Sequence, residues 1–180
     1  MNILLMFYGG TIMNDDLKGK ILWCSKIKKG VKIVVPNENL CSAYLKKAND
    51  SLTAMNLIST AKLYDWAADA AYYSRYHAIY ALLQKCGIES EIHDCSILSI
   101  KFLFSDKISA TLIKELENAK NQRVDLVYYT NRGPTEEELK KNIALASNFV
   151  LVIEKVIFEL KQEDIKEIRQ KLSSVISRTA

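Results

Sequence analysis

The stretch from Tyr64 to Leu83 constrains the fold more than any other part of this 180-residue chain. It mixes small residues with tyrosines and one histidine. Residues three and four apart share one face of a helix, so a stripe of mostly small side chains runs along this segment. That stripe comprises Leu63, Ala67, Ala70, Ser74, His77 and Ala81. A second stripe of large rings, formed by Trp66, Tyr73 and Tyr80, predicts filling of the space between helices. The pattern indicates a buried helix that other helices approach closely.

The composition favours long helices around one core. The chain has only six glycines and two prolines, too few for the many tight turns of an all-β fold. Hydrophobic residues make up 49% and charged residues 26%, the usual mix of a globular domain. The length suits one sizeable core. We therefore expect an all-α, antiparallel up-and-down helical bundle over residues 36–180, preceded by an N-terminal extended arm over 1–35.

Local signals predict where the helices begin and end. Asn37 is a good N-cap for a first helix, and Gly87 is a natural residue to follow a second helix over 63–86. Thr135 and Glu138 form a capping box, which predicts a helix start at this point. The remaining predicted elements are a shorter helix within 92–104, a helix from 108 towards 128 or 129, a heptad-like seam over 139–160 and an extra C-terminal helix over 165–176.

The first 35 residues do not join this pattern. Residues 17–35 alternate weakly between apolar and polar, which predicts an extended arm or a small hairpin packed through Trp23 and through Val34 or Val35. The arm carries a dense set of lysines, consisting of Lys18, Lys20, Lys26, Lys28, Lys29 and Lys32. These lysines fit either a solvated surface or contacts to phosphate or a partner. The overall net charge of +4 does not distinguish the two.

Residues 1–12 permit a second interpretation. Gly9-Gly10 is what a ribosome-binding purine stretch would encode if it were translated, and Met13 lies a short gap downstream. The hypothesis is that the natural start is Met13 and that residues 1–12 are not natural coding sequence. N-terminal mass analysis of untagged native protein that finds Met1 or Asn2 would reject it. The alternative is a short apolar strand or leader.

The cysteines and the absence of targeting signals predict a reduced, cytoplasmic protein. Cys24, Cys41, Cys86 and Cys95 form no C-x-x-C pair and no histidine-rich zinc pattern, so we expect reduced, buried or half-buried thiols and no metal. The apolar start lacks a basic region and a cleavage site, and no apolar run approaches a membrane span. Glycine-rich phosphate loops, paired catalytic carboxylates and known nucleophile patterns are also missing, so no cofactor is expected.

From residue 37 to about residue 160 the chain resembles the HEPN domains of bacteria and archaea. The matching elements are Tyr64 with Ala67, Ala71-Tyr72-Tyr73, His77-Ala78, Ala81-Leu82-Leu83, Gly87 and His93. The resemblance implies a helical bundle that dimerises, with a small nucleotidyltransferase as partner in a toxin–antitoxin-like gene pair. It also implies binding of RNA or a nucleotide.

The ribonucleases of the resembled family use an arginine followed after four to six residues by a histidine. In that arrangement the guanidinium holds the phosphate and the imidazole handles protons. Here Arg75 and His77 are too close in sequence, and no histidine follows Arg123. Arg123 with Tyr128 keeps the spacing, but a phenol of normal pKa near ten replaces the imidazole. We therefore predict a HEPN domain that binds without cleaving, rather than an enzyme.

The candidate ligand-binding residues are Arg75, His93, Arg123, Asp125 and Tyr128. His93, Arg123, Asp125 and Tyr128 could meet in one polar pocket. The alternatives are a structural cap for His93 and an ordinary ion pair for Arg123 and Asp125.

Two further predictions concern the rings of the 63–86 helix. For His77 we expect a buried imidazole hydrogen-bonded between helices. Its tyrosines, Tyr72, Tyr73, Tyr76 and Tyr80, could stack on bases, but core packing is the stronger expectation. The competing functions are a ribonuclease toxin using His93 or His77 with Arg123, and a protein-interaction scaffold.

Overall fold

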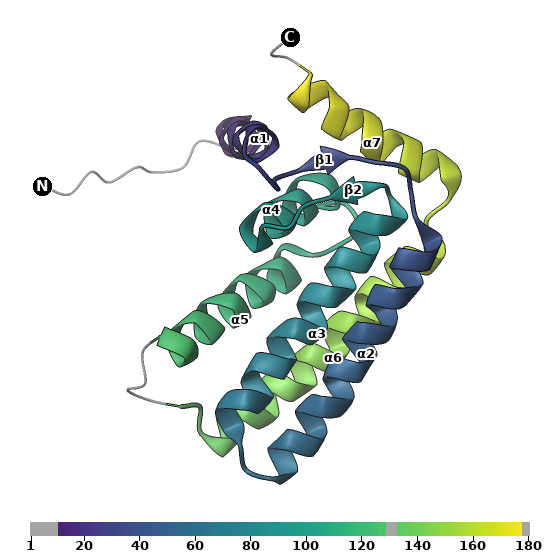
Figure 1. Cartoon of the computed structure of the whole chain (residues 1–180). Helices are drawn as coiled ribbons and strands as arrows, with labels where there is room; N and C mark the ends of the chain where they lie inside the picture. Colours follow the sequence, from purple (N-terminus) through teal and green to yellow (C-terminus); the bar gives the residue numbers. More distant parts are fainter. Residues whose placement is uncertain (1–10, 129–132, 178–180) are drawn as a thin grey trace, which may run out of the picture.

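The computed structural model describes residues 11–128 and 133–177, with the side chains of residues 16–126 and 133–177. Within them the chain forms seven helices and two short strands (Figure 1). Their bounds are α1 (Thr11–Lys26), β1 (Lys32–Ile33), α2 (Glu38–Thr60), α3 (Tyr64–Lys85), β2 (Ile88–Glu89), α4 (His93–Leu103), α5 (Ala110–Tyr128), α6 (Glu136–Glu159) and α7 (Gln162–Ile176). The predicted all-α fold is confirmed.

The helices form a long bundle with a second group of elements over one end. Helices α2, α3 and α6 run side by side along the long axis, and α5 lies along α3 (Figure 1). Helices α1, α4 and α7, together with β1 and β2, gather over the end where α3 finishes; we call these five elements the end layer. The two strands pair antiparallel, with Lys32 opposite Glu89 and Ile33 opposite Ile88.

The helix boundaries follow the local signals in the sequence. The Asn37 side chain accepts a hydrogen bond from the Leu40 N–H at 3.0 Å, as an N-cap should. Thr135 and Glu138 make both bonds of a capping box at the start of α6. After α3, Gly87 has a φ of +64°, a left-handed conformation that glycine adopts at little cost. All three predicted boundaries are confirmed.

Helix α3 lies at the centre of the core. In the predicted small-residue stripe, Ala67, Ser74 and Ala81 are fully buried, as expected, whereas Ala70 and His77 are half-buried. The expectation was wrong for Trp66, whose exposed fraction is 67%, and for Leu63 at 53%. Both lie where α3 begins, beside the α2–α3 turn, so fewer helices surround them.

The predicted extended conformation of the N-terminal arm is wrong for residues 11–26, which form α1. Ile21 and Cys24 are fully buried, and Leu17 packs against the same core; these three positions share one helix face. Trp23 was expected to anchor the arm but is 60% exposed, because it lies on another face of α1. Val35 is likewise exposed. Only residues around β1 are extended, and β1 pairs with β2 rather than closing a local hairpin. The hypothesis that residues 1–12 are not natural coding sequence falls mostly on residues 1–10, and these lie outside the described part of the chain.

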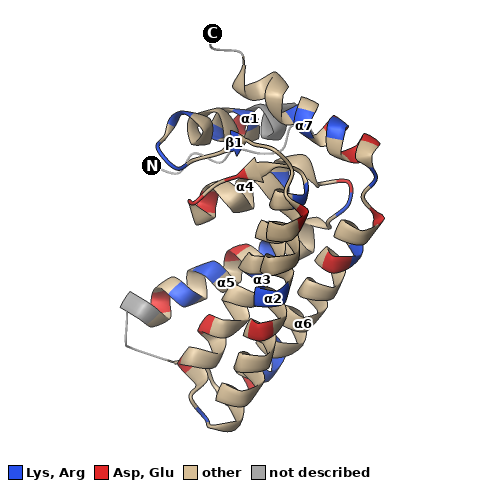
Figure 2. Ribbon diagram, turned by 45° about the vertical axis from the view of Figure 1, so that its right-hand side comes forward, with Lys and Arg blue, Asp and Glu red and all other residues tan. Residues whose placement is uncertain are grey.

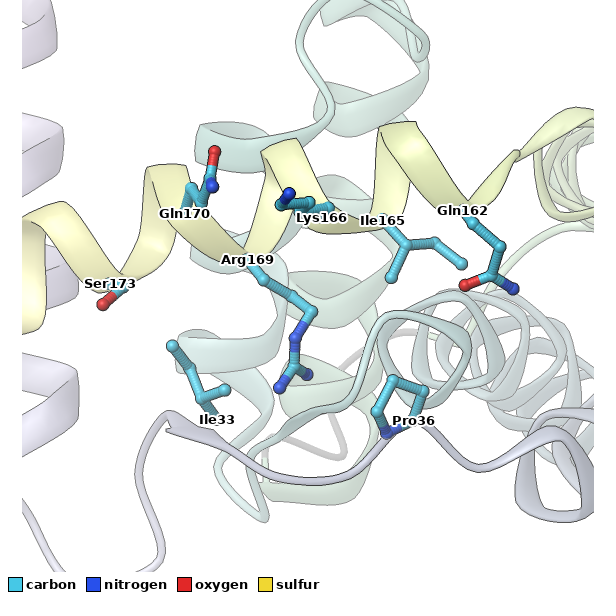
Figure 3. Close-up of a pocket in the computed structure, with 8 residues that line it drawn as sticks. All are labelled: Ile33, Pro36, Gln162, Ile165, Lys166, Arg169, Gln170 and Ser173. Atoms are coloured by element: carbon cyan, nitrogen blue, oxygen red, sulfur yellow. The ribbon is translucent and has the colours of Figure 1, made fainter.

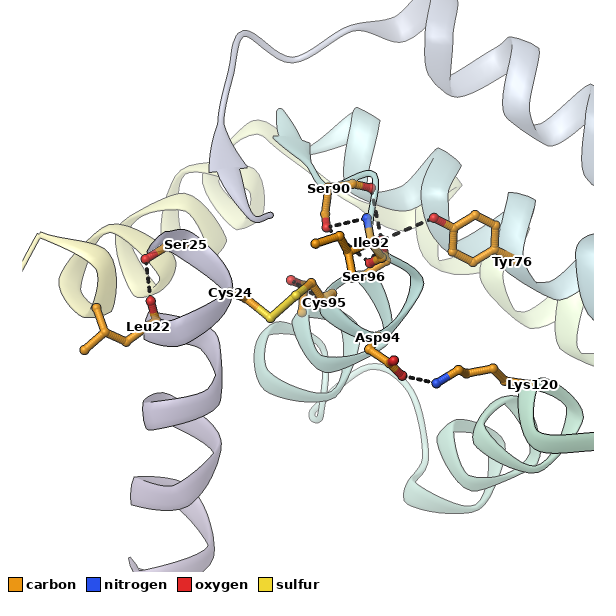
Figure 4. The surroundings of a disulfide bond; sticks show 11 residues. Leu22, Cys24, Ser25, Tyr76, Ser90, Ile92, Asp94, Cys95, Ser96 and Lys120 are labelled. Atoms are coloured by element: carbon orange, nitrogen blue, oxygen red, sulfur yellow. Dashed lines mark hydrogen bonds and ion pairs between the residues drawn. A yellow bond between two sulfur atoms is a disulfide. The ribbon is translucent and has the colours of Figure 1, made fainter. Parts of the chain in front are cut away.

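Two of the four cysteines form a disulfide, so the prediction of four reduced thiols is wrong for Cys24 and Cys95. Their sulfur atoms are bonded and the Cα atoms lie 5.7 Å apart, which joins α1 to α4 (Figure 4). The residues are 71 positions apart, so sequence spacing gave no signal for the pair. Cys41 and Cys86 are free and buried, as predicted. Such bonds are rare in the reducing cytosol, and the predicted cytoplasmic location stays a prediction.

Arg169 attaches α7 to the rest of the end layer. Its Nη1 donates to the carbonyl oxygens of Val34, Cys86 and Gly87 at 2.7–3.0 Å. In Figure 3 the Arg169 side chain points from α7 into a pocket of about 430 Å³, between Ile33 and Pro36. Because three main-chain acceptors share this guanidinium, it serves to hold the chain together at this point. None of the described helices is both long and apolar enough to cross a membrane.

Candidate functional site

The candidate site is a set of aromatic and polar side chains on α3 and its neighbours, which we call the histidine–tyrosine face. It comprises Tyr44 of α2, Asp69, Tyr72, Tyr73, Tyr76, His77 and Tyr80 of α3, His93 of α4 and Arg123 of α5. Helical geometry explains the grouping, since Asp69, Tyr73, His77 and Tyr80 recur at steps of three and four along α3. The face therefore brings together both histidines of the chain and one arginine.

His93 is held tightly by two tyrosines. Its Nδ1 lies 2.5 Å from the hydroxyl oxygen of Tyr72. Its ring stacks on Tyr76, with 3.8 Å between ring centroids and an interplanar angle of 20°. The ring is half-buried at the start of α4. These contacts fix the orientation of the imidazole before any ligand arrives.

Burial and charge keep His93 neutral at pH 7. Burial lowers the pKa of His93, and the positive charge of Arg123 lowers it further. Burial raises the pKa of Tyr72, so the phenol keeps its proton. When that O–H donates to Nδ1, the ring hydrogen is on Nε2. In this arrangement Nε2 of His93 offers a hydrogen bond donor and has no lone pair with which to take a proton.

Arg123 lies against the same tyrosines. Its guanidinium carbon is 5.1 Å from the ring centre of Tyr73 and 5.7 Å from that of Tyr72. Its Nε donates to the Asp69 carboxylate at 2.8 Å, and both side chains are about one quarter exposed. Asp69 orients the guanidinium and offsets its charge. The terminal amino groups of Arg123 make no hydrogen bond that the structure shows within its described residues.

His77 occupies the neighbouring part of the face. Its Nδ1 lies 3.3 Å from the Ser51 hydroxyl of α2, and its ring stacks on Tyr73 at 5.7 Å. Burial lowers its pKa, and the charge of Lys47 lowers it further. The contact to Ser51 is the bond between helices that the sequence predicted. However, the ring is half-buried rather than enclosed.

The structure brings together only part of the predicted pocket. His93 and Arg123 meet around Tyr72 and Tyr73, whereas Asp125 is exposed and lines a different cavity beside Gly133 and Pro134. Asp125 is two residues from Arg123 and so lies on another face of α5. The side chain of Tyr128 lies outside the described residues. Arg75 is buried among α3, α5 and α6, away from this face.

Sequence reasoning missed Asp69 as the partner of Arg123. The signal was available, because Asp69 precedes Tyr73 by one helical turn and therefore shares its face. Pairing Arg123 with Asp125 relied on closeness in sequence, which for residues two apart on a helix points the side chains in different directions.

Charges of both signs cover the molecule. Figure 2 shows lysine and arginine interspersed with aspartate and glutamate along the helices, with a lysine-rich turn between α1 and β1. Within the described residues, no group of three or more His, Cys, Asp or Glu side chains is placed to hold a metal ion. The histidine–tyrosine face is therefore an aromatic site with one paired arginine, and it lacks a strong field of either sign.

A comparison with protein-family models decides the family. A model described as HEPN domain matches residues 41–156, which is more than half of the chain. The chain belongs to the HEPN domain family. The matched span of this HEPN domain runs from the first turns of α2 through most of α6 and includes every residue of the histidine–tyrosine face. Helices α1 and α7 and strand β1 fall outside it. A comparison with curated proteins found no match.

Proposed function

We propose that this HEPN domain binds single-stranded RNA or a nucleotide on the histidine–tyrosine face and does not cleave it. The observation that carries the proposal is the stacking of the Arg123 guanidinium on Tyr73, beside the half-buried ring of His77. Aromatic rings and a stacked arginine bind bases and phosphates with little dependence on sequence. The exposed Trp66 lies on α3 one turn before Asp69 and extends the aromatic surface towards the α2–α3 turn.

The bonding of His93 supports binding without turnover. Cleavage of RNA without a metal needs a group that takes the proton of the 2′-hydroxyl. With Tyr72 donating to its Nδ1, His93 presents a donor at Nε2. Arg123 is tied to Asp69, whose negative charge weakens the attraction for a phosphate. In that arrangement the face offers rings and hydrogen-bond donors, and His93 is not prepared as a general base.

A direct test measures binding and cleavage together. A labelled oligouridine is titrated with the full chain, and fluorescence anisotropy gives the dissociation constant at several salt concentrations. Because stacking on an aromatic side chain contributes about 1–3 kcal/mol per base, Tyr73→Ala and Trp66→Ala should each weaken binding by about 5- to 150-fold. Lys155→Gln, an exposed substitution on α6, is the matched control and should leave binding unchanged. Tight binding that neither Tyr73→Ala nor Trp66→Ala weakens would contradict the proposal.

A second candidate function is a ribonuclease that uses His93 or His77 with Arg123. The observation that favours it is that His93 and Arg123 lie against the same two tyrosines although 30 positions separate them in sequence. Cleavage of the oligonucleotide in a chelator, lost in both His93→Ala and Arg123→Ala, would establish this function. If cleavage were lost in His77→Ala and kept in His93→Ala, the proton transfer would be assigned to His77.

We also propose that the domain works with a protein partner, a small nucleotidyltransferase in a toxin–antitoxin-like pair, and that it forms a homodimer. These proposals rest on the family and on exposed apolar residues of α6. Phe158 is 90% exposed and Leu151 is 64% exposed; seven positions apart, they share one helix face. Co-expression with the product of an adjacent gene, followed by copurification, tests the partner. Charged substitutions at Leu151 and Phe158 should abolish binding of the partner, formation of the dimer, or both. If the protein is only an interaction scaffold, it should bind the partner but not RNA.

A further inference from the structure

Arg75 is the most deeply buried charged residue of the described chain and is not fully paired. Its exposed fraction is 1%. Nη1 donates to the Ala71 carbonyl at 2.9 Å, and Nη2 donates to the carbonyl and the side-chain oxygen of Asn142 at 3.0 and 2.7 Å. Its Nε is buried and has no hydrogen-bond partner. These bonds use three of the five N–H groups of the guanidinium, and the buried Nε–H has no partner.

On α5, the carboxylate of Glu115 has an acceptor atom without a hydrogen-bond donor. Oε2 of Glu115 is also buried without a hydrogen-bond partner. Glu115 is close enough for its charge to raise the pKa of Arg75, although burial has the larger effect and lowers that pKa to about 10. Nevertheless the two groups form no direct ion pair that the structure shows among the residues it describes. Arg75 and Glu115 thus line the same pocket, and each has one buried atom without a hydrogen-bond partner.

The pocket between them has a volume of about 300 Å³. Its lining comprises Arg75, Glu115, Asn118, Ala119, Gln122, Glu138, Lys141, Asn142 and Leu145. The amide of Asn142 donates to the Gln122 oxygen at 3.3 Å, which leaves the Gln122 amide nitrogen as a further donor. Pockets of this size hold small molecules. The lining combines apolar surface, including that of Ala119 and Leu145, with polar groups of both signs of charge.

This pocket is separate from the histidine–tyrosine face. Successive residues of a helix are turned by about 100°, so Arg75 points nearly opposite to Tyr73 and His77 on α3. It faces the groove between α5 and α6 instead. Loss of one site therefore need not disturb the other.

Leaving one buried atom of each of these two charged groups without a hydrogen-bond partner costs free energy, and a bound group can recover it. The missing partner must accept a hydrogen bond from Arg75 Nε and donate one to Glu115 Oε2. We propose that this pocket binds a small planar ligand with a neutral amide edge, in which a carbonyl oxygen and an N–H lie side by side. Both a carboxamide and the lactam edge of a nucleobase have this arrangement. A carboxylate lacks the donor, and a free amine lacks the acceptor.

The experiment titrates the isotope-labelled full chain with two probe pairs and follows its NMR spectrum. Uracil is compared with 1,3-dimethyluracil, and nicotinamide with methyl nicotinate, because the second member of each pair has no N–H to donate. Binding of uracil alone would identify the lactam as the preferred edge, and binding of nicotinamide alone would identify the carboxamide. In either case the side-chain amide signals of Asn118, Gln122 and Asn142 should shift with saturation, and the donor-free analogue should leave them unchanged.

The decisive variant is Glu115→Gln, because replacing the buried Arg75 would test folding as well as binding. Removing the charged acceptor should weaken binding of the amide probe by about 10-fold or more. Glu117→Gln is the matched control on α5, since Glu117 bonds to Lys101 outside this pocket and should leave binding unchanged. Equal binding of the donor-free analogues would overturn the proposal. The proposal would also be overturned if neither uracil nor nicotinamide bound and a crystal structure showed only a water molecule between Arg75 and Glu115.

Discussion

The long bundle and the end layer share one apolar core, and the end layer adds a few specific bonds between its elements. In the bundle, α3 packs against α2, α5 and α6 through many small or apolar side chains that are fully buried. In the end layer, α1 is bonded to α4 by one disulfide and α7 is attached through the three hydrogen bonds of Arg169. The family match covers the bundle and leaves out α1, β1 and α7.

The difference indicates how each region responds to change. A bundle with distributed apolar contacts loses stability gradually as single residues are altered, because each contact is a small part of the total. The end layer also buries apolar side chains, such as Ile21, Ile100 and Leu172, but its elements are joined in addition by a few specific bonds and are vulnerable at those bonds. We therefore expect breaking them to open the end layer locally while the bundle stays folded.

The largest expected effect follows removal of the disulfide. Cys24→Ser with Cys95→Ser should lower the free energy of unfolding by about 2–5 kcal/mol, since the bond closes a long loop of the unfolded chain. Urea unfolding of the oxidised and reduced protein measures the loss, and hydrogen exchange locates it. Cys41→Ser is the control at a free thiol. Exchange that rises equally in α1 and α3 would show that the two regions unfold as one unit.

Gly87→Ala should come next, because Gly87 joins the bundle to the end layer. A Cβ there would lie 2.4 Å from the Val34 carbonyl oxygen and 2.2 Å from Arg169 Nη1, in a backbone with a φ of +64°. The left-handed penalty and the overpacking together should lower the free energy of unfolding by about 2–4 kcal/mol. Gly19→Ala in α1, where a Cβ meets nothing within 4 Å, is the control and should be neutral or stabilising. Urea denaturation curves compare the two variants.

A pH titration addresses both regions, because His77 lies in the bundle and His93 begins α4 of the end layer. The pKa values of His77 and His93 are both lowered in the folded state, chiefly by burial. The unfolded chain therefore binds more protons near pH 6, and the stability present above the unfolded value of about 6.5 is lost as the pH falls through that range. Urea unfolding between pH 7.5 and 5 should show the decline. His93→Gln should make the free energy of unfolding fall less steeply with decreasing pH. An unchanged pH dependence would mean that His93 does not cause the effect.

The smallest expected effect on stability is at Trp66. Because its ring is mostly exposed, Trp66→Ala should change the free energy of unfolding by no more than about 0.5 kcal/mol. Ala71→Leu, at a fully buried position of the same helix, is the contrasting variant and should cost about 1–3 kcal/mol through overpacking. Thermal unfolding measures both. A large loss at Trp66 would show that the α2–α3 end is packed in a way that its exposure does not reveal.

Predictions from sequence succeeded where the cause was local. Asn37 and the Thr135–Glu138 pair bond to backbone groups within one turn, and Gly87 supplies a conformation that other residues avoid. For that reason the ends of α2, α3 and α6 could be assigned. Predictions failed where the deciding partner lay far along the chain. Cys24 meets Cys95, and Asp69 rather than Asp125 meets Arg123.

The candidate site was predictable in its parts but not in its arrangement. Tyr73, His77, His93 and Arg123 were recognised from their types and from the family pattern. Their bonds were not, because the hydroxyl of Tyr72 reaches His93 only after α3 and α4 have packed. The unsatisfied Arg75 and Glu115 likewise become visible only in the packed groove of α5 and α6.

The amino-acid sequence by itself determined a helical chain, its main boundaries and the small-residue stripe at its centre, since propensity, capping and periodicity act within a few residues. Only the tertiary structure decided that residues 11–26 form a helix bonded to α4 and that His93 and Arg123 share one aromatic face. It also decided that Arg75 is buried with its Nε–H unpaired. Those outcomes depend on which surfaces are removed from water together, and that is settled by packing over the whole chain.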